Sequence, residues 1–135
     1  MTQLPAPAFN ADSKRFWEAA RENRLLVSHC DACTRLFFPP RHLCPHCWSD
    51  KISWRDSGGA GVVYSFTIIH RAPVAEFAPR VPYVVALITL AEGPRMMANI
   101  VGEDALETRV GDAVKVEFEP RADGWKVPQF RRSAR

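Results

Sequence analysis

All four cysteines of this chain lie in one short segment, where they form two Cys-x-x-Cys pairs. The first pair is Cys30 and Cys33 and the second is Cys44 and Cys47, with ten residues between the pairs. Each pair can turn the backbone tightly enough for both sulfurs to reach one ion at about 2.3 Å, and a short loop can return the second pair to it. Four thiolates suit Zn²⁺ and leave no open coordination position. The spacing therefore predicts a structural zinc site rather than a catalytic one.

Two Cys-x-x-Cys pairs are also compatible with other chemistry. Iron in a rubredoxin-like centre, a thiol redox pair and disulfides remain as alternatives to zinc. The N-terminus, MTQLPAPAFN, lacks the basic start and apolar core of a signal peptide. We therefore expect a cytoplasmic protein, in which structural disulfides are rare. His29, His42 and His46 crowd the same segment, but four thiolates already complete a tetrahedral site, so we interpret these histidines as exposed loop residues.

A short amphipathic helix is predicted ahead of the cysteines, within residues 10–23. Phe16 and Trp17 recur with alanines at helical spacing, and Asp12 or Ser13 can cap the start of the helix. A helix of this length is stable only when it packs on another surface. We expect its aromatic residues to be core anchors.

After Trp54 the sequence changes to the pattern of short β-strands separated by turns. The five predicted strands are Gly61 to His70, Tyr83 to Leu90, Arg95 to Val101, Ala113 to Glu119, and Trp125 to Val127. Five short strands without a convincing helix between them favour a small closed barrel, of which the OB-fold is the commonest five-stranded form. We interpret the final residues, FRRSAR, as a mobile terminus. No run approaches the roughly 18 apolar residues of a membrane span, so we expect no membrane association.

The order and spacing of these motifs resemble those of zinc-ribbon plus OB-fold proteins associated with acyl-CoA metabolism. The matching stretches are Cys30 to Cys47 (CDACTRLFFPPRHLCPHC), Gly59 to Thr67 (GAGVVYSFT) and Val81 to Leu90 (VPYVVALITL). The resemblance implies a mainly β chain with a short helix and rubredoxin-like zinc ribbon in residues 1–54 and an OB-fold barrel with a C-terminal tail in residues 55–135. One departure is Thr34, which stands where the family usually has glycine, and it bears on the turn geometry.

The resemblance also implies an accessory subunit in lipid, steroid or related acyl-CoA metabolism. Its partner would be a thiolase-like enzyme, an aldolase-like thiolase homologue or an enoyl-CoA hydratase-type protein, and it would bind acyl-CoA or support the partner's assembly and activity. The residues agree, because no cysteine lies outside the ribbon and His70 has no neighbour resembling a catalytic dyad or triad. We expect a hetero-oligomer, and self-association of the isolated chain, because something must cover the apolar segment around Phe37 and Phe38.

The basic residues suggest where CoA would bind. Arginine supplies 14 of the 18 basic residues, and the net charge is only +3, which suits local pairing with phosphates. Arginine can clamp the phosphates of CoA, while adenine can stack on aromatic rings. The candidate acyl-CoA-binding residues are Arg35, Phe37, Phe38, Arg41, His70 and Arg71. The alternative is that the two phenylalanines pack on the barrel or a partner and that the arginines are solvated.

Two other functions remain as alternatives. Zinc ribbons and OB-folds both occur in nucleic-acid-binding modules. Single-strand binders interleave several basic residues with aromatic ones, whereas the segments AVKVEFEP and ALITLAEG place acidic residues beside apolar ones. The second alternative is a rubredoxin-like electron carrier, which would require iron and a reductase partner.

Overall fold

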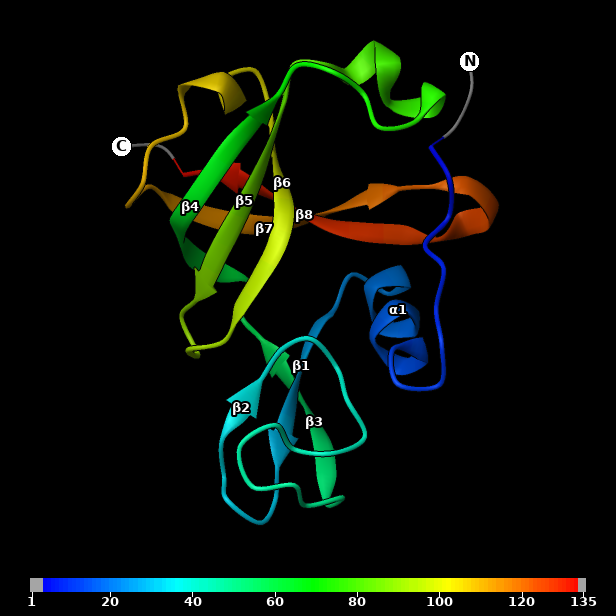
Figure 1. Cartoon of the computed structure of the whole chain (residues 1–135), viewed down its shortest axis with the longest axis vertical. Coiled ribbons are helices and arrows are strands. Elements are labelled where there is room, and N and C mark those ends of the chain that lie inside the picture. Colours follow the sequence, from blue (N-terminus) through cyan, green and yellow to red (C-terminus); the bar gives the residue numbers. More distant parts are fainter. Residues whose placement is uncertain (1–3, 134–135) are drawn as a thin grey trace.

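The strand that leads into the first cysteine is the centre of a three-stranded antiparallel sheet. In the computed structural model, which describes residues 4–133, β1 (Leu25–Cys30) lies between β2 (Leu36–Phe37) and β3 (Ile52–Ser57). The Cα register places Ser28 opposite Phe37 on one side and opposite Trp54 on the other. This sheet and the cysteine loops form the ribbon at the lower end of the molecule in Figure 1.

The remaining strands close into a five-stranded barrel with the order β4-β5-β6-β8-β7. The strands are β4 (Ala60–Ile69), β5 (Tyr83–Leu90), β6 (Arg95–Val101), β7 (Ala113–Pro120) and β8 (Lys126–Arg132). Closure depends on the parallel pairing of β6 with β8, in which Ile100 lies opposite Phe130. The fold is therefore mainly β, with a closed OB-fold barrel following the ribbon, as predicted.

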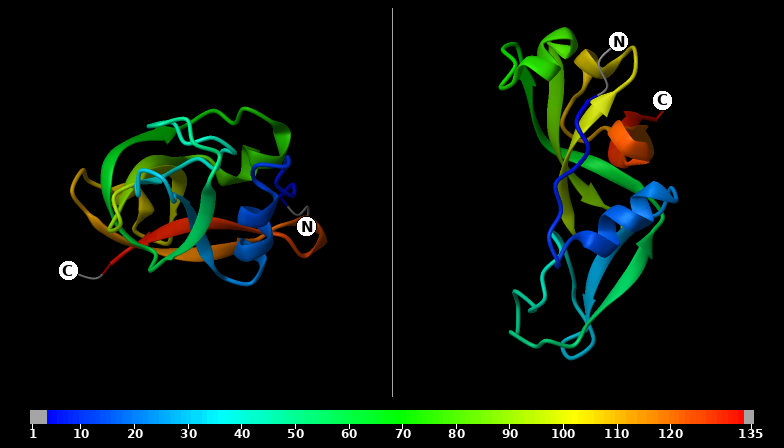
Figure 2. Two further views of the ribbon diagram at one scale, coloured as in Figure 1. Left: turned by 90° about the horizontal axis from the view of Figure 1, so that it is seen from below. Right: turned by 90° about the vertical axis from the view of Figure 1, so that its right-hand side faces the viewer.

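Three short 3₁₀ helices occupy the connections within the barrel. They are η1 (Ala75–Arg80), η2 (Ala105–Glu107) and η3 (Ala122–Gly124). The η1 segment lies at the end of the barrel that is farthest from the ribbon, as both Figure 1 and the right-hand view of Figure 2 show. Within residues 4–133, no helix is long and apolar enough to cross a membrane.

The predicted N-terminal helix is confirmed as α1 (Lys14–Arg21), with Ser13 at the N-cap position. The side chain of Ser13 does not bond the helix. Instead, the Asn10 N–H donates to the Ser13 hydroxyl at 3.1 Å, and the Ser13 N–H donates to Asn10 Oδ1 at 3.0 Å. These reciprocal bonds fix the turn that precedes the helix.

Helix α1 and strand β1 share one hydrophobic core with the barrel. Phe16 of α1 and Val27 of β1 are buried in the same cluster as Val63, Ile88 and Phe130 from three barrel strands. Figure 2 shows α1 between the ribbon and the barrel, against the end of the barrel that faces the ribbon. Residues from the N-terminal segment therefore complete the barrel core, so the two parts of the chain are packed together rather than joined only by a linker.

The prediction of a mobile terminus after residue 129 is wrong for residues 130–132, and residues 134–135 lie outside the described part of the chain. Strand β8 extends to Arg132, beyond the predicted end at Val127, and the side chain of Phe130 is completely buried. Arg132 donates to Asp112 at 2.9 Å and to Asp104 at 3.1 Å. The segment KVPQFRR lacks the alternation of a typical strand, and its pairing with β6 and β7 comes from distant parts of the sequence.

Candidate metal centre and adjoining groove

The two Cys-x-x-Cys turns have the same backbone geometry. The Thr34 N–H donates to the Cys30 carbonyl at 2.8 Å, and the Trp48 N–H donates to the Cys44 carbonyl at 2.9 Å. Thr34 and Trp48 each follow the second cysteine of a pair, and both have left-handed backbone conformations, with φ of 67° and 68°. Because glycine adopts this conformation most easily, the turn explains the family's preference for glycine at the position of Thr34.

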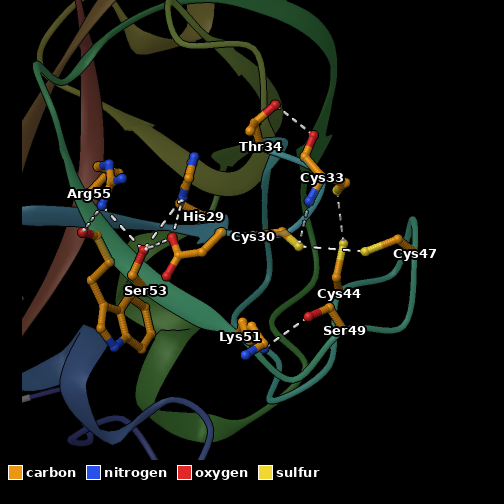
Figure 3. A network of polar contacts seen from close by, with 12 residues as sticks. His29, Cys30, Cys33, Thr34, Cys44, Cys47, Ser49, Lys51, Ser53 and Arg55 are labelled. Carbon is orange, nitrogen blue, oxygen red and sulfur yellow. Dashed lines mark hydrogen bonds and ion pairs between the residues drawn. The ribbon is translucent and has the colours of Figure 1, made fainter.

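The four sulfurs form a cluster that fits one tetrahedral ion (Figure 3). The Sγ atoms of Cys30 and Cys47 are 3.5 Å apart, those of Cys33 and Cys44 are 3.7 Å apart, and all four lie within 4.8 Å of one another. A tetrahedral ion with Zn–S bonds of about 2.3 Å requires sulfurs about 3.8 Å apart. The donor set therefore matches zinc with four thiolate ligands and no vacant position.

Backbone amides stabilise negative charge on the cluster. The Cys33 N–H donates to Cys30 Sγ at 3.4 Å, and the His46 N–H donates to Cys44 Sγ at 3.3 Å. The bond from Cys33 is the main reason that the pKa of Cys30 is lowered to about 6. The amide of Ser49 lowers the pKa of Cys47, but hydrogen bonding to Cys30 and burial outweigh this and raise that pKa to about 12. Zinc binds thiolates, so a divalent ion at this site would displace the protons of the thiols.

The nearby histidines have polar partners away from the sulfurs. His29 Nδ1 lies 2.8 Å from Asp31 Oδ1, and His42 Nδ1 lies 3.3 Å from Asp12 Oδ2. The hydrogen bond from the Ser53 hydroxyl is the largest effect that lowers the pKa of the Asp31 carboxyl, and the hydrogen bond with His29 is the second largest. Within the described residues, no histidine or carboxylate joins the group of four sulfurs.

A broad groove of about 800 Å³ lies between the ribbon and the barrel. Ribbon residues form one wall, and the β5–β6 turn forms the other. The lining residues are Thr34, Arg35, Leu36, Phe37, Phe38, Arg41, Pro45, His46, Glu92, Gly93, Pro94 and Arg95. The groove thus brings together four of the six candidate CoA-binding residues.

Cationic side chains dominate the polar lining of this groove. Arg35 and Arg41 come from the ribbon, and Arg95 comes from the start of β6. The guanidinium of Arg35 lies 3.2 Å from His46 Nδ1, so it is held at the ribbon wall. Guanidinium groups are well suited to phosphate and carboxylate recognition because their donors match two oxygens at once. The groove therefore favours an anionic ligand.

Glu92 is the one carboxylate among the residues that line the groove. Both of its oxygens accept hydrogen bonds at the junction between the ribbon and the barrel. Its Oε1 accepts from the Ser57 hydroxyl at 2.8 Å, and its Oε2 accepts from the Gly58 N–H at 3.0 Å. Partial burial raises the pKa of Glu92, but the bonds from Gly58 and Ser57 outweigh it, so the pKa lies below its ordinary value. Glu92 thus holds the barrel wall of the groove against the end of β3.

The two phenylalanines have different surroundings. Phe37 is only 4% exposed and packs in the ribbon core with Cys30 and Cys44. Phe38 is half-buried, and its ring meets that of Phe16 at a centroid distance of 5.4 Å with edge-to-face geometry. The chain itself therefore covers most of both rings, which leaves Phe38 as the more accessible of the two.

The other two candidate residues, His70 and Arg71, lie apart from the groove. They follow β4, whose last residue, Ile69, pairs with Tyr83, whereas the groove lies at the opposite end of β5 beyond Leu90. At about 3.3 Å per residue, the eight residues of β5 separate the two locations by roughly 25 Å. The structure thus does not bring all six candidate residues together.

Four polar residues of the groove were absent from the sequence-based candidates: Thr34, His46, Glu92 and Arg95. The tripeptide Glu92-Gly93-Pro94 is recognisable from the sequence as a tight hairpin turn. Nothing local indicates that this turn faces the ribbon, because that position depends on how the barrel packs against β1 and α1.

Comparison with known proteins shows matches over most of the chain. Residues 17–53 match the family described as the ChsH2 rubredoxin-like zinc ribbon domain, and residues 54–119 match the ChsH2 C-terminal OB-fold domain. The chain is 37% identical, over 94% of its length, to a probable enoyl-CoA hydratase alpha subunit of Thermomonospora curvata, and it spans 39% of that protein. It is also 37% identical over 95 residues to a DUF35 domain-containing scaffold protein of Methanothermobacter thermautotrophicus, matching 70% of this chain and 71% of that protein.

A solved structure has the same arrangement. One chain of a structure described as the Ltp2-ChsH2(DUF35) aldolase superposes with a TM-score of 0.85 at 36% sequence identity. The match covers 95% of this chain and 99% of that chain. The helix, ribbon and barrel are therefore similar in both proteins.

Proposed function

This chain belongs to the DUF35 family of proteins with a ChsH2-type zinc ribbon and OB-fold domain, and we propose that it is an accessory subunit of an enzyme that acts on CoA esters. Its relatives support this role, because they carry the names of a hydratase subunit and a scaffold protein, and the similar solved structure is described as an aldolase with two named components. The partner is a hydratase-type, thiolase-like or aldolase-like enzyme.

We further propose that the groove between ribbon and barrel binds the CoA part of an acyl-CoA. The cationic groove is the observation on which this proposal rests: Arg35, Arg41 and Arg95 line it, while Glu92, its one carboxylate, is bonded to the junction. Charged hydrogen bonds from Arg35 and Arg41 would hold the phosphates of CoA. Phe38 and the apolar residues of the lining would accommodate the uncharged parts of the ligand.

The ribbon contains serine, histidine and aspartate close together, but their arrangement does not resemble a nucleophilic triad. The Ser53 hydroxyl donates to Asp31 Oδ1 at 2.7 Å, and His29 Nδ1 contacts the same oxygen at 2.8 Å. In a nucleophilic triad, the histidine accepts the proton of the serine hydroxyl and the carboxylate holds the other side of the ring. Here the carboxylate accepts the hydrogen bond of the serine hydroxyl, and His29 Nδ1 lies farther from that hydroxyl, at 3.5 Å, so the network joins β1 to β3 and is not arranged as a triad. This supports a role in which the partner supplies the catalytic groups.

The zinc ribbon has a structural role in this proposal. Cys30, Cys33, Cys44 and Cys47 would hold Zn²⁺, which would fix the ribbon wall that carries Arg35 and Arg41. A closed site with four thiolates offers no position for a substrate oxygen. We therefore propose that the metal takes no direct part in the reaction.

Calorimetric titration of CoA into the complex of this chain with its CoA enzyme tests the binding proposal. Replacing Arg35 or Arg41 with Ala removes charged hydrogen bonds of about 1.5–3 kcal/mol, so each variant should weaken CoA binding on the order of ten-fold or more. Arg71→Ala is the matched control and should bind CoA as the wild-type complex does. Equal affinities for all three variants would refute a CoA site in the groove. Tight, salt-sensitive binding of single-stranded DNA or RNA by the chain alone would favour the nucleic-acid alternative.

A further inference from the structure

The outer surface formed by β4, β5 and β6 is unusually poor in charge. Arg95 is the single charged residue in the segments Ala60–Ile69, Tyr83–Leu90 and Arg95–Val101, whereas 24% of the whole chain is charged. These strands lie side by side (Figure 1). Alternate residues of β5 and β6 are buried in the barrel core, and the residues between them lie on the outer surface. Depletion of charged residues is a feature of the cores of protein–protein interfaces.

Large apolar side chains are exposed on the half of this surface that is nearer to the ribbon. Val62 and Tyr64 of β4 are 45% and 50% exposed, and Met97 of β6 is 65% exposed. The register places Val62 opposite Thr89, and Met97 opposite Leu87, so these residues share one continuous surface. The other half is partly covered by η1, where Phe77 packs against Tyr83 at a centroid distance of 6.1 Å.

Arg95 lies flat across the exposed half. Its Nε donates to the Thr89 hydroxyl at 3.2 Å, and its guanidinium lies 3.7 Å from the centroid of the Tyr64 ring. The side chain thus reaches from β6 over β5 to β4 and is held there by a hydrogen bond and a cation–π contact. Arg95 also lines the groove, so this surface and the groove are continuous at one residue.

We propose that the β4–β6 face, defined by Val62, Tyr64, Leu87, Thr89, Arg95 and Met97, is the surface on which the partner CoA enzyme docks. This inference rests on the proposed function. Tyrosine, methionine and arginine are enriched in interface cores, and here they surround one another on an otherwise uncharged surface. The docked enzyme presents an apolar patch to Met97 and Tyr64, and a carboxylate to Arg95.

Charge complementarity favours an enzyme over a second copy of this chain. A two-fold interface between copies would pair the β4–β6 face with itself. That face, all of which lies within the described residues, carries Arg95 and offers no carboxylate in return. A partner with an acidic residue satisfies Arg95, whereas a second copy does not. Because Arg95 also borders the groove, an enzyme docked here lies beside the proposed CoA site.

The test uses the thiolase-like or hydratase-type enzyme that co-purifies with the full chain. Met97→Lys places a charge in the centre of the face without disturbing the core, and it should weaken the complex at least ten-fold in calorimetric titration. Val110→Lys is the matched control, because Val110 is 67% exposed and lies outside the face. Its affinity should remain within two-fold of wild type. Hydrogen exchange of the wild-type complex should show slower exchange in β4 and β6 than in the free chain.

The outcomes separate this inference from the proposed function. If the wild-type chain does not bind any CoA-ester enzyme, both the proposed function and the proposed docking surface are wrong. If the complex forms but Met97→Lys binds as tightly as wild type, the docking surface alone is wrong. If the free chain is a dimer that Met97→Lys dissociates while enzyme binding is unchanged, a second copy occupies the face and the proposal is overturned.

Discussion

The carboxylate of Glu92 accepts a hydrogen bond from the hydroxyl of Ser57 at 2.8 Å, and this bond joins the barrel to the last residue of the ribbon sheet. The neighbouring Gly58 N–H donates to the same side chain at 3.0 Å. Glu92 therefore fixes the distance between the two walls of the groove, since the β5–β6 turn forms one wall and the ribbon forms the other.

Replacing Glu92 with Gln should destabilise the protein at neutral pH by about 1 kcal/mol, because a charged acceptor on a partly exposed site is lost. The pKa of Glu92 lies below its ordinary value. The stabilisation is thus fully present above the unfolded-state pKa of about 4.3 and is lost as the pH falls through the lower folded-state pKa. Urea denaturation of both proteins between pH 7 and pH 3 should show the difference shrinking at the acidic end. Glu76→Gln, on the exposed surface of η1, is the control, and a difference that does not change with pH would contradict the assignment.

Purified protein should contain about one zinc per chain, and Cys44→Ser should lose it, because a thiolate ligand is removed. Cys44 and Cys30 pack with Phe37 in a cluster separate from the barrel core, so the cysteine loops and β2 should unfold when the metal is lost. The barrel strands should keep much of their circular dichroism and their slow hydrogen exchange. His42→Ala should retain zinc, as expected of an exposed histidine outside the cluster. Stoichiometric iron with visible absorbance would show that the site is a rubredoxin-like centre instead.

Thr34→Gly should raise the free energy of unfolding by up to about 1 kcal/mol. Thr34 has a φ of 67°, and a β-branched residue is strained in that conformation. The gain is limited because the Thr34 hydroxyl donates to the Cys33 carbonyl at 2.6 Å and because glycine adds freedom to the unfolded chain. Thermal denaturation of the zinc-loaded protein measures the change. A loss of stability larger than that of the control Thr34→Ala would contradict this interpretation.

Phe16→Ala should destabilise the whole molecule by about 3–5 kcal/mol, since it leaves a cavity in the core that α1 shares with the barrel. Phe9→Ala is a matched control, because Phe9 is 43% exposed and contacts Trp125 at the surface. It should cost less than about 1 kcal/mol. Denaturant unfolding followed by both far-UV circular dichroism and tryptophan fluorescence should show one transition in each case. An unchanged barrel in Phe16→Ala would mean that the N-terminal segment folds separately.

The features that were predictable from the sequence are those set by local spacing. Each cysteine pair forms its own local turn, so the four clustered cysteines could be named from the sequence. The segment Tyr83–Leu90 is a continuous, almost wholly apolar run between Pro82 and a turn, so both of its ends were predicted correctly. In contrast, β8 ends in a run that includes Phe130, whose partners lie on β6 and β7. Its strand conformation is set by those distant partners and is not apparent in the local pattern.

The groove was predictable only in part for the same reason. Arg35 and Arg41 flank the apolar segment of the ribbon and could be recognised as neighbours. Arg95 and Glu92 reach the groove only because α1 and β1 pack against the end of the barrel, which places its β5–β6 turn beside the ribbon. Arg71 was grouped with Arg41 by residue type, yet the length of β4 places it at the other end of the barrel.

The most direct test of an accessory role in CoA-ester chemistry is the kcat/KM of the partner enzyme with and without this chain, for an acyl-CoA and for the matching acyl-pantetheine. This chain alone should turn over no CoA ester. When it is added to the enzyme, kcat/KM for the acyl-CoA should rise on the order of ten-fold or more, because binding of the CoA phosphates contributes to transition-state stabilisation. The increase should be much smaller with acyl-pantetheine, which lacks those phosphates. An unchanged kcat/KM for the acyl-CoA would contradict the account, and equal increases for both substrates would contradict its CoA site.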